Sequence, residues 1–252
     1  MPQFSDDLFL GTAQTYMGVN TNANLGDPAP MELGVGPLGR IYVWDTVPLT
    51  KSTTNIATAS AYTSTITLTA GTGTTSVTLN NGSTVVQLDV PRAVGVTIGA
   101  GTITNRNVTI TGYDYYGQAM SEVIATGTTQ STTVNGKKAF FQILSATVSG
   151  AVGATVALGT TDILGAPVKV GNAGYIANTG WDNTLGNDAG TFVAAVTTTA
   201  TTTTGDVRGT YVPSSATDGA KRLVVGILLP ALAVGPNATR AGALGVNQNL
   251  AS

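Results

Sequence analysis

The stretch NRNVTITGYDYYGQAMSEVIATGTTQSTTVNGKKAFFQIL, residues 105–144, decides the fold class of this chain. Val108 and Ile110 alternate with polar residues, and a period of two is typical of a half-buried β-strand. The segment GYDYYG that follows predicts a turn, because Asp114 can bond its own backbone two residues on and Gly117 can adopt a positive φ. The stretch therefore begins as a β-hairpin.

Similar runs recur along the rest of the chain. In the return strand of the hairpin, residues 119–125, one face carries Met120, Glu122 and Ile124. Further strand-like segments are 41–49, 63–69, 93–98, 139–144, two short runs within 145–158, 174–188, 192–196 and 223–229; residues 76–90 form a second hairpin, and residues 162–170 a strand or a turn. Turn signals separate them, and no segment has the period of an amphipathic helix of three turns. We therefore predict an all-β fold, a β-sandwich or barrel-like body of many short antiparallel strands.

Several residues predict where strands turn or end. Asn81-Gly82 predicts a type I′ hairpin turn, and Asn135-Gly136 predicts another tight turn. Pro91 should end its strand, because proline cannot donate to the ladder. The run LVVGILL at 223–229 lacks alternation, which predicts burial on both faces. The nearly pure threonine segment 197–204 should be extended.

The charged residues have ordinary structural interpretations. Lys137-Lys138 would form a solvated turn, or else pair with an acidic neighbour at an interface. Turn chemistry explains most of the aspartates without catalysis; those at predicted turns are Asp114, Asp162, Asp182, Asp188 and Asp218. The alternatives are a carboxylate pair for glycoside hydrolysis, or Ca²⁺ ligands from residues 182–188, whose spacing is not that of an EF-hand.

The composition restricts the possible functions. The chain has 252 residues, no cysteine and no histidine, which removes disulfides, thiol nucleophiles and the commonest general base and metal ligand. We therefore predict no catalytic activity, no metal and no cofactor. A net charge of -2 gives no basic footprint for nucleic acid. We find no signal peptide, and the longest apolar run, broken by Pro230, is too short to span a bilayer.

The low charge density carries information of its own. Charged residues make up 10% of the chain, against about 25% in typical globular domains. A threonine-coated, very stable β protein is one explanation. The other, which we favour, is that partner subunits cover much of the surface, since most soluble monomers keep more surface charge for solubility.

The two ends of the chain differ from the body. Residues 1–39 have little periodicity and are punctuated by glycine and proline, so we predict an extended N-terminal arm, a β-rich body at 40–234 and a C-terminal tail at 235–252. A tether without a role is the alternative for the arm. Apolar residues favour docking on a partner, and the predicted contact residues are Phe4, Leu8, Phe9, Leu10, Tyr16 and Met17.

An ordered set of short blocks gives the chain a family resemblance. The blocks are GPLGRIYVWD (36–45), LDVPR (88–92), VTITGYDYYGQAM (108–120), VNGKKAFFQ (134–142), DILGAP (162–167), GDVRGTYVP (205–213) and GPNATR (235–240). Together they resemble a family of virion structural proteins of tailed bacteriophages. The resemblance covers nearly the whole chain and implies an assembly role without catalysis. It implies no residue-level site and no particular place in the particle.

Within that class we expect a capsid decoration (cement) protein that binds the major capsid protein, assembles as a homotrimer and resides in the virion after assembly in the host cytoplasm. Flexible termini, a β-rich body and sparse charge suit a protein held between shell subunits. A tail or head-fibre component is the alternative within virions. A carbohydrate-binding or hydrolysing β domain on the virion surface is the alternative from another class, and it would need exposed aromatic residues.

Overall fold

The computed structural model describes residues 40–184, 186–196 and 202–229. Twelve β-strands and one short 3-10 turn make up its secondary structure, and the described residues contain no α-helix. The elements are β1 (Arg40–Thr46), β2 (Ala57–Ser60), β3 (Thr74–Thr78), β4 (Thr84–Ile98), β5 (Asn107–Tyr113), β6 (Ala119–Ala125), β7 (Thr132–Val148), β8 (Val156–Gly165), η2 (Ala173–Tyr175), β9 (Ile176–Trp181), β10 (Thr191–Val193), β11 (Thr210–Val212) and β12 (Leu223–Leu229). The predicted all-β fold is confirmed.

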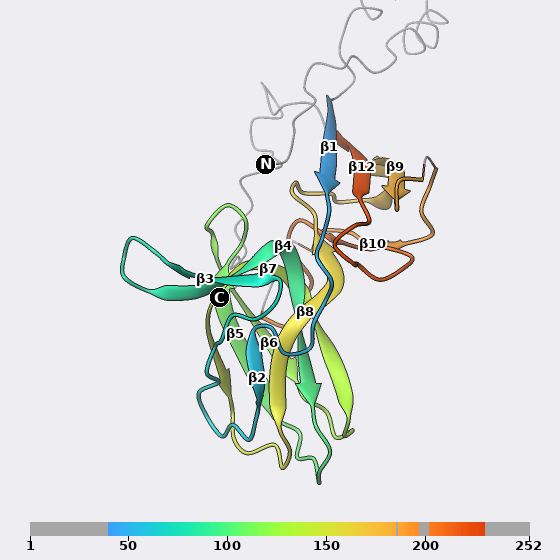
Figure 1. Cartoon of the computed structure of the whole chain (residues 1–252). Helices are drawn as coiled ribbons and strands as arrows, with labels where there is room; N and C mark the ends of the chain where they lie inside the picture. The colour runs from blue at the N-terminus through green and yellow to red at the C-terminus, as the bar shows by residue number, and fades with distance from the viewer. Residues whose placement is uncertain (1–39, 185, 197–201, 230–252) are drawn as a thin grey trace, which may run out of the picture.

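A nine-stranded antiparallel sheet forms most of the body. Its order is β10-β11-β8-β4-β7-β5-β6, with β2 on β8 and β3 on β4. The long strands β4, β7 and β8 lie side by side, and the sheet curls into a half-barrel (Figure 1). The β5–β6 hairpin has the predicted form: Asp114 accepts a hydrogen bond from the Tyr116 amide, and Gly117 has φ +75°.

The main hydrophobic core lies against this curled sheet. Alternate residues of β5 and β6 point into it, including Val108, Ile110, Met120 and Ile124. The connection from β1 to β3 covers the core and contributes Ile56 and Ile66, which are also buried. This connection is fixed to the sheet through backbone bonds to Leu158 and Ala146. Apolar burial of this kind is the dominant stabilising term in folding.

A second, three-stranded sheet has the order β1-β12-β9. Its β1–β12 pair joins the two ends of the described chain, since Arg40 lies opposite Leu229 and Thr46 opposite Leu223. On β12, Leu223, Val225 and Ile227 are buried and the residues between them are half-buried, so burial on both faces is only partly realised. The two sheets meet where β1 approaches β4 and β8 (Figure 1).

The prediction that Pro91 ends its strand is wrong. β4 continues through Pro91 to Ile98. The pairing of β4 with β7 shifts register between Gln87 and Arg92, and its pairing with β8 shifts between Arg92 and Val94. Proline is tolerated inside a sheet at such bulges, because the ladder is already interrupted there.

The predicted turn at Asn135-Gly136 is also wrong, and with it the solvated lysine turn. β7 runs without a break from Thr132 to Val148. Lys137 points outward, but Lys138 is only 1% exposed. Gly136 is needed for close packing instead, since a Cβ there would lie 2.5 Å from the Glu122 carboxylate.

Smaller differences concern local structure. Residues 63–69 form a single bridge, at Thr65, in place of a strand, although Ile66 is buried. Only Gly82 has a positive φ in the β3–β4 turn, so it is not the predicted type I′ turn. Asp162 lies within β8, and residues 202–204 form a turn in place of the predicted extended segment. Residues 1–39, 197–201 and 230–252, which include all six predicted contact residues, lie outside the described chain.

Candidate functional site

The junction between the two sheets contains a second hydrophobic cluster. Tyr42 and Trp44 project into it from β1, because alternate residues of an edge strand face the same side. The large sheet contributes Leu164 from β8 and Tyr211 from β11, while Trp181 comes from β9. Burial raises the pKa of the Tyr42 hydroxyl well above its ordinary value. The junction is therefore a packed interface, and the two sheets share this core.

Six charged side chains are buried in or beside this junction. The acids are Asp114, Glu122 and Asp206, and the bases are Arg92, Lys138 and Arg208. Each buried base lies beside an acid: Arg208 beside Asp114, Lys138 beside Glu122 and Asp206, and Arg92 beside the partly buried Asp89. Burial requires such pairing, since an unpaired charge inside a protein is very costly.

Glu122 of β6 lies beside Lys138 of β7. The Glu122 carboxylate accepts the backbone N–H of Lys137 at 2.5 Å and that of Lys138 at 3.3 Å. Burial raises the pKa of Glu122 to about 7, although these two N–H groups and the Lys138 charge act against the rise. Burial also lowers the pKa of Lys138, and the charges of Glu122 and Asp206 oppose that fall.

Asp206 and Arg208 connect the segment before β11 to the large sheet. Asp206 accepts the Ala139 amide at 2.9 Å and the Arg208 amide at 2.8 Å. Burial raises the pKa of the Asp206 carboxyl. Arg208 forms an ion pair with Asp114 at 2.5 Å and lies 4.9 Å above the ring of Tyr116. These contacts hold residues 205–209 against the β5–β6 turn.

Arg92 is the third buried base. It lies at the bulge of β4, donates to Asp89 Oδ2 at 2.7 Å, and donates from both terminal nitrogens to the Leu49 carbonyl at 3.2 Å. Asp89 Oδ2 also accepts the Leu49 amide at 2.7 Å. Burial lowers the pKa of the Arg92 guanidinium, and Asp89 opposes that fall. The chain leaving β1 is thus fixed to β4 by one ion pair.

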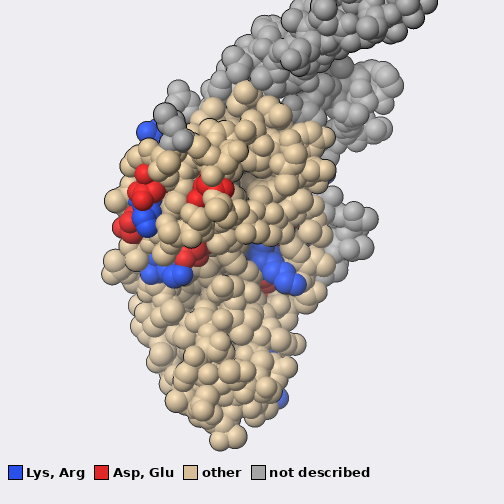
Figure 2. Space-filling model, turned by 90° about the vertical axis from the view of Figure 1, so that its right-hand side faces the viewer, with Lys and Arg blue, Asp and Glu red and all other residues tan. Residues whose placement is uncertain are grey.

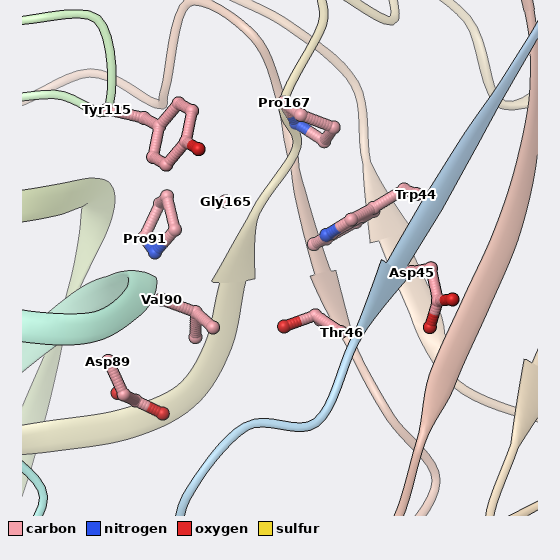
Figure 3. Close-up of a pocket in the computed structure, with 9 residues that line it drawn as sticks. All are labelled: Trp44, Asp45, Thr46, Asp89, Val90, Pro91, Tyr115, Gly165 and Pro167. Carbon is pink, nitrogen blue, oxygen red and sulfur yellow. The ribbon is translucent and has the colours of Figure 1, made fainter. Parts of the chain in front are cut away.

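A cavity of about 130 Å³ opens beside this ion pair. Figure 3 shows Trp44, Thr46, Val90, Pro91, Tyr115 and Pro167 arranged around a common space, with Asp89 at one end. The Asp45 carboxylate points away from the Trp44 ring (Figure 3) and pairs with Arg222. The cavity wall is therefore mainly apolar and aromatic, and its most distinctive polar group is the Asp89 carboxylate.

The outer surface is unevenly charged. Figure 2 shows acidic and basic side chains gathered at the level of the junction, while the lower part of that face is almost free of them. The sequence explains the pattern, since no charged residue occurs in 52–88 or in 139–161. These residues form β3, much of β7 and the connections around β2 and β8.

The other aspartates considered from sequence serve local structure. Asp188 binds Ser214 and Tyr211, and these hydrogen bonds hold its pKa below the usual range although burial acts the other way. Asp182 has φ +56° in the turn after β9, and Asp218 accepts two amides in the turn before β12. Among the described residues no three acidic side chains come together as a possible metal site.

Sequence analysis missed the junction residues as a group. Several of them come from the sequence blocks quoted above: Trp44, Asp89, Tyr115, Pro167 and Arg208 lie in five of these blocks, whereas Glu122 and Trp181 lie in none. The signal is present in the pattern: LDVPR and NGKKAFF place charged residues between apolar ones inside strands. Because these segments are far apart in the sequence, no local pattern shows that they come together in the fold.

No protein-family model matches the chain, and neither the curated proteins nor the solved structures contain a match. In the described part of the chain, no helix is long and apolar enough to cross a membrane.

Proposed function

We propose that this chain is a non-enzymatic structural protein of a bacteriophage virion. In this proposal it is a capsid decoration (cement) protein that binds the major capsid protein as a homotrimer and stabilises the shell. Its place is the virion, after assembly in the host cytoplasm. The proposal has its origin in the sequence blocks that resemble virion structural proteins, and the arrangement of the body is consistent with it.

The observation that carries the proposal is the position from which both terminal segments leave the body. Arg40 and Leu229 are direct partners at one end of the β1–β12 pair. The 39 residues before Arg40 and the 23 residues after Leu229 therefore leave from neighbouring points. Two long segments starting at one place can reach the same neighbouring subunit, and an extended strand can add to a sheet edge.

The charge distribution supports the same role. Much of the charge at the junction is buried and balanced, and the surface of residues 52–88 and 139–161 carries no charge at all. Charged residues are depleted at the cores of protein interfaces, because their desolvation is costly. A broad neutral surface of threonine, serine and alanine suits close contact with further subunits.

The alternatives are a tail or head-fibre component and a carbohydrate-binding domain on the virion surface. Sugar-binding surfaces rely on accessible aromatic rings for stacking. Trp44 and Trp181 are 6% and 5% exposed, so both tryptophans of the chain are in the interior. Among the described residues Tyr175, at 43% exposed, is the large aromatic side chain open to solvent, and a single exposed ring favours the assembly role over a sugar-stacking platform.

Reconstitution with undecorated shells tests the proposal. We expect the full chain to bind shells, and F4S/L8S/F9S/L10S to bind much more weakly because its apolar contacts are removed. The matched control D6S/D7S changes the same segment without removing apolar side chains and should bind normally. Unchanged occupancy by the fourfold variant would place docking on the β body.

Two further measurements complete the test. Light scattering of the purified protein should give the mass of a trimer. A reconstruction of the complete particle should place the chain on the shell; density confined to the tail or to fibres would replace the decoration role by the alternative.

A further inference from the structure

The β3–β4 hairpin gives the large sheet an open edge. β3 pairs with β4 alone, and Figure 1 shows the hairpin reaching out to one side of the body. The Leu79 amide donates to the Ser83 carbonyl at 2.8 Å, so by alternation Val77, two residues back, is also hydrogen-bonded to β4. The N–H and C=O groups of Ser76 and Thr78 therefore point away from β4, and none of the described residues is hydrogen-bonded to them.

This edge lacks the features that usually keep an edge strand from pairing with another chain, which are charge, proline, a bulge or a cover. β3 has five residues, and its pairing with β4 has no register shift. Neither a charged residue nor a proline occurs in residues 52–88, and Ser76 and Thr78 are both exposed. The edge is therefore open to a further strand.

The other edge strands of the two sheets differ from β3. β10 has only three residues, and β2 and β9 pair with register shifts. β6 donates its Val123 amide to the Thr202 carbonyl at 2.7 Å, and β1 carries Arg40 and Asp45. Among the described strands, β3 thus combines an uncharged sequence with regular geometry at an uncovered edge.

The pattern of β3 fits a second copy of the same strand. Two identical antiparallel strands meet about a two-fold axis, so a charge on the strand would lie near the same charge of the other copy, and β3 has none. The Thr74 amide already donates to the Gly71 carbonyl, which leaves Ser76 and Thr78 as the outward donors of the strand. Pairing Ser76 of one copy with Thr78 of the other uses all of them and places Val77 on the axis.

We propose that β3 joins two copies of this chain edge to edge, in antiparallel register about a two-fold axis at Val77. Val77 then packs against Val77 of the second copy, and Leu79 against Thr75, which continues the half-buried apolar side of the hairpin across the contact. The inference goes beyond the proposed function. A two-fold contact cannot close a trimer, so this one is separate from the proposed trimer contacts and joins one trimer to another.

A single introduced cysteine reports on the register, because the chain has none of its own. In a non-hydrogen-bonded antiparallel pair the Cα atoms lie about 4.5 Å apart, which a disulfide can span. Val77→Cys should therefore form covalent dimers under mild oxidation. Ser76→Cys is the matched control, since its side chain is more exposed but the two copies of residue 76 lie more than about 7 Å apart. On a non-reducing gel we expect Val77→Cys to dimerise at least about tenfold faster.

A second pair of variants tests the outward amides. Thr78→Pro removes one outward N–H from each copy and leaves the bonds to β4, because proline is tolerated on an edge strand whose N–H faces solvent. Combined with Val77→Cys, it should slow dimer formation at least about tenfold. Thr78→Val keeps both the amide and the branched shape, so it should not slow dimer formation. Circular dichroism checks that each variant is folded.

Hydrogen exchange resolved to single amides measures the contact in the unmodified protein. The Ser76 and Thr78 amides should exchange more slowly as the protein concentration rises, whereas the Val77 amide is bonded to β4 at every concentration. Three results would each overturn the inference: Ser76→Cys dimerising as fast as Val77→Cys, Thr78→Pro and Thr78→Val behaving alike, or exchange at Ser76 and Thr78 staying fast at every concentration. None of these results depends on whether the protein decorates a shell.

Discussion

The large and small sheets differ in how far apart in the sequence their paired strands lie. In the large sheet, β3–β4 and β5–β6 are hairpins of neighbouring strands, and apolar side chains fill the core beneath them. In the small sheet, β1 pairs with β12 from the opposite end of the described chain. Closing such a long loop costs chain entropy before any contact is made. The small sheet therefore depends on tertiary contacts at the junction more than on local signals.

The two regions also differ in what holds them together. The main core is almost entirely apolar, whereas the junction combines aromatic packing with six buried charges. Apolar burial is nondirectional, but a buried ion pair is favourable only in one geometry and is costly if one partner is removed. The junction thus fixes the position of the small sheet relative to β4 and β8, and the following experiments separate the two kinds of stabilisation.

The largest effect should come from removing a buried charge. Lys138→Met leaves the charges of Glu122 and Asp206 without the cation that faces them, and we expect a loss of about 3–5 kcal/mol in the free energy of unfolding. Urea denaturation monitored by circular dichroism measures it. The adjacent Lys137→Met is the matched control: its side chain is exposed, so the change should stay within about 0.5 kcal/mol. Equal losses for both variants would contradict the buried network.

The second largest effect is a pH dependence of the free energy of unfolding, which is expected for the buried charges and not for the apolar core. Folding raises the pKa of Glu122 from 4.5 to about 7, so the folded state binds a proton that the unfolded state has released between these values. The resulting stabilisation is fully present below pH 4.5 and is lost as pH rises through 7. The free energy of unfolding of the unmodified protein, compared with that of Glu122→Gln, should therefore fall by on the order of 3 kcal/mol between pH 4.5 and 8. Each tenfold change in proton affinity is worth about 1.4 kcal/mol.

Thermal unfolding of both proteins at several pH values checks this prediction. Asp206 remains in both, so its own raised pKa largely cancels in the difference. Asp162 and Asp188 have lowered pKa values, and the stability they contribute is lost only as pH falls below about 4. A difference that stays constant from pH 4.5 to 8 would show that Glu122 has an ordinary pKa.

A smaller and pH-independent effect is expected in the large sheet. Ile98→Val removes one methylene group from a fully buried position of β4, and the expected loss is about 0.5–1.5 kcal/mol. The loss should be the same at pH 5 and pH 8, because the residues opposite Ile98, Thr132 and Val156, do not titrate. Denaturant midpoints at the two values measure it, and a clear pH dependence would mean that the two regions are not energetically separate.

The same contrast explains what sequence can predict. The β5–β6 hairpin is predictable in detail because its alternation and its turn residues lie within one short stretch. The continuation of β4 through Pro91 and the burial of Lys138 are not, because both depend on partners far along the chain. The bulge that accommodates Pro91 forms only against β7 and β8, and the neighbours of Lys138 come from β6 and from the segment before β11.

The candidate site shows this limit most clearly. The sequence around Trp44 predicts only a strand, that around Asp89 only a strand end, and that around Tyr115 only a turn. They line one cavity only because β1 packs beside the bulge of β4 and beside the β5–β6 turn. Sequence periodicity describes faces of single strands, so it cannot show that three such faces converge.

The smallest effect tests the rim of the junction. Lys51 pairs with Asp162 of β8, and Asp162 also accepts both the amide and the hydroxyl of Thr217. The Lys51 side chain is 51% exposed, so solvent screens the pair and Lys51→Ala should cost no more than about 1 kcal/mol. Asp162 keeps its bonds to Thr217 in this variant, which limits the loss further.

The effect of salt on stability distinguishes the exposed Lys51–Asp162 pair from the buried charges around Lys138. Surface attraction weakens as the Debye length falls from about 10 Å at 0.1 M to about 3 Å at 1 M, whereas buried pairs are screened much less. The difference between Lys51→Ala and the unmodified protein should therefore vanish in 1 M NaCl, while the loss caused by Lys138→Met persists. Unfolding curves at the two salt concentrations give both values. If the Lys51→Ala difference survived in 1 M salt, the ion pair would have to be shielded from solvent, and the junction would extend further outward than its buried core.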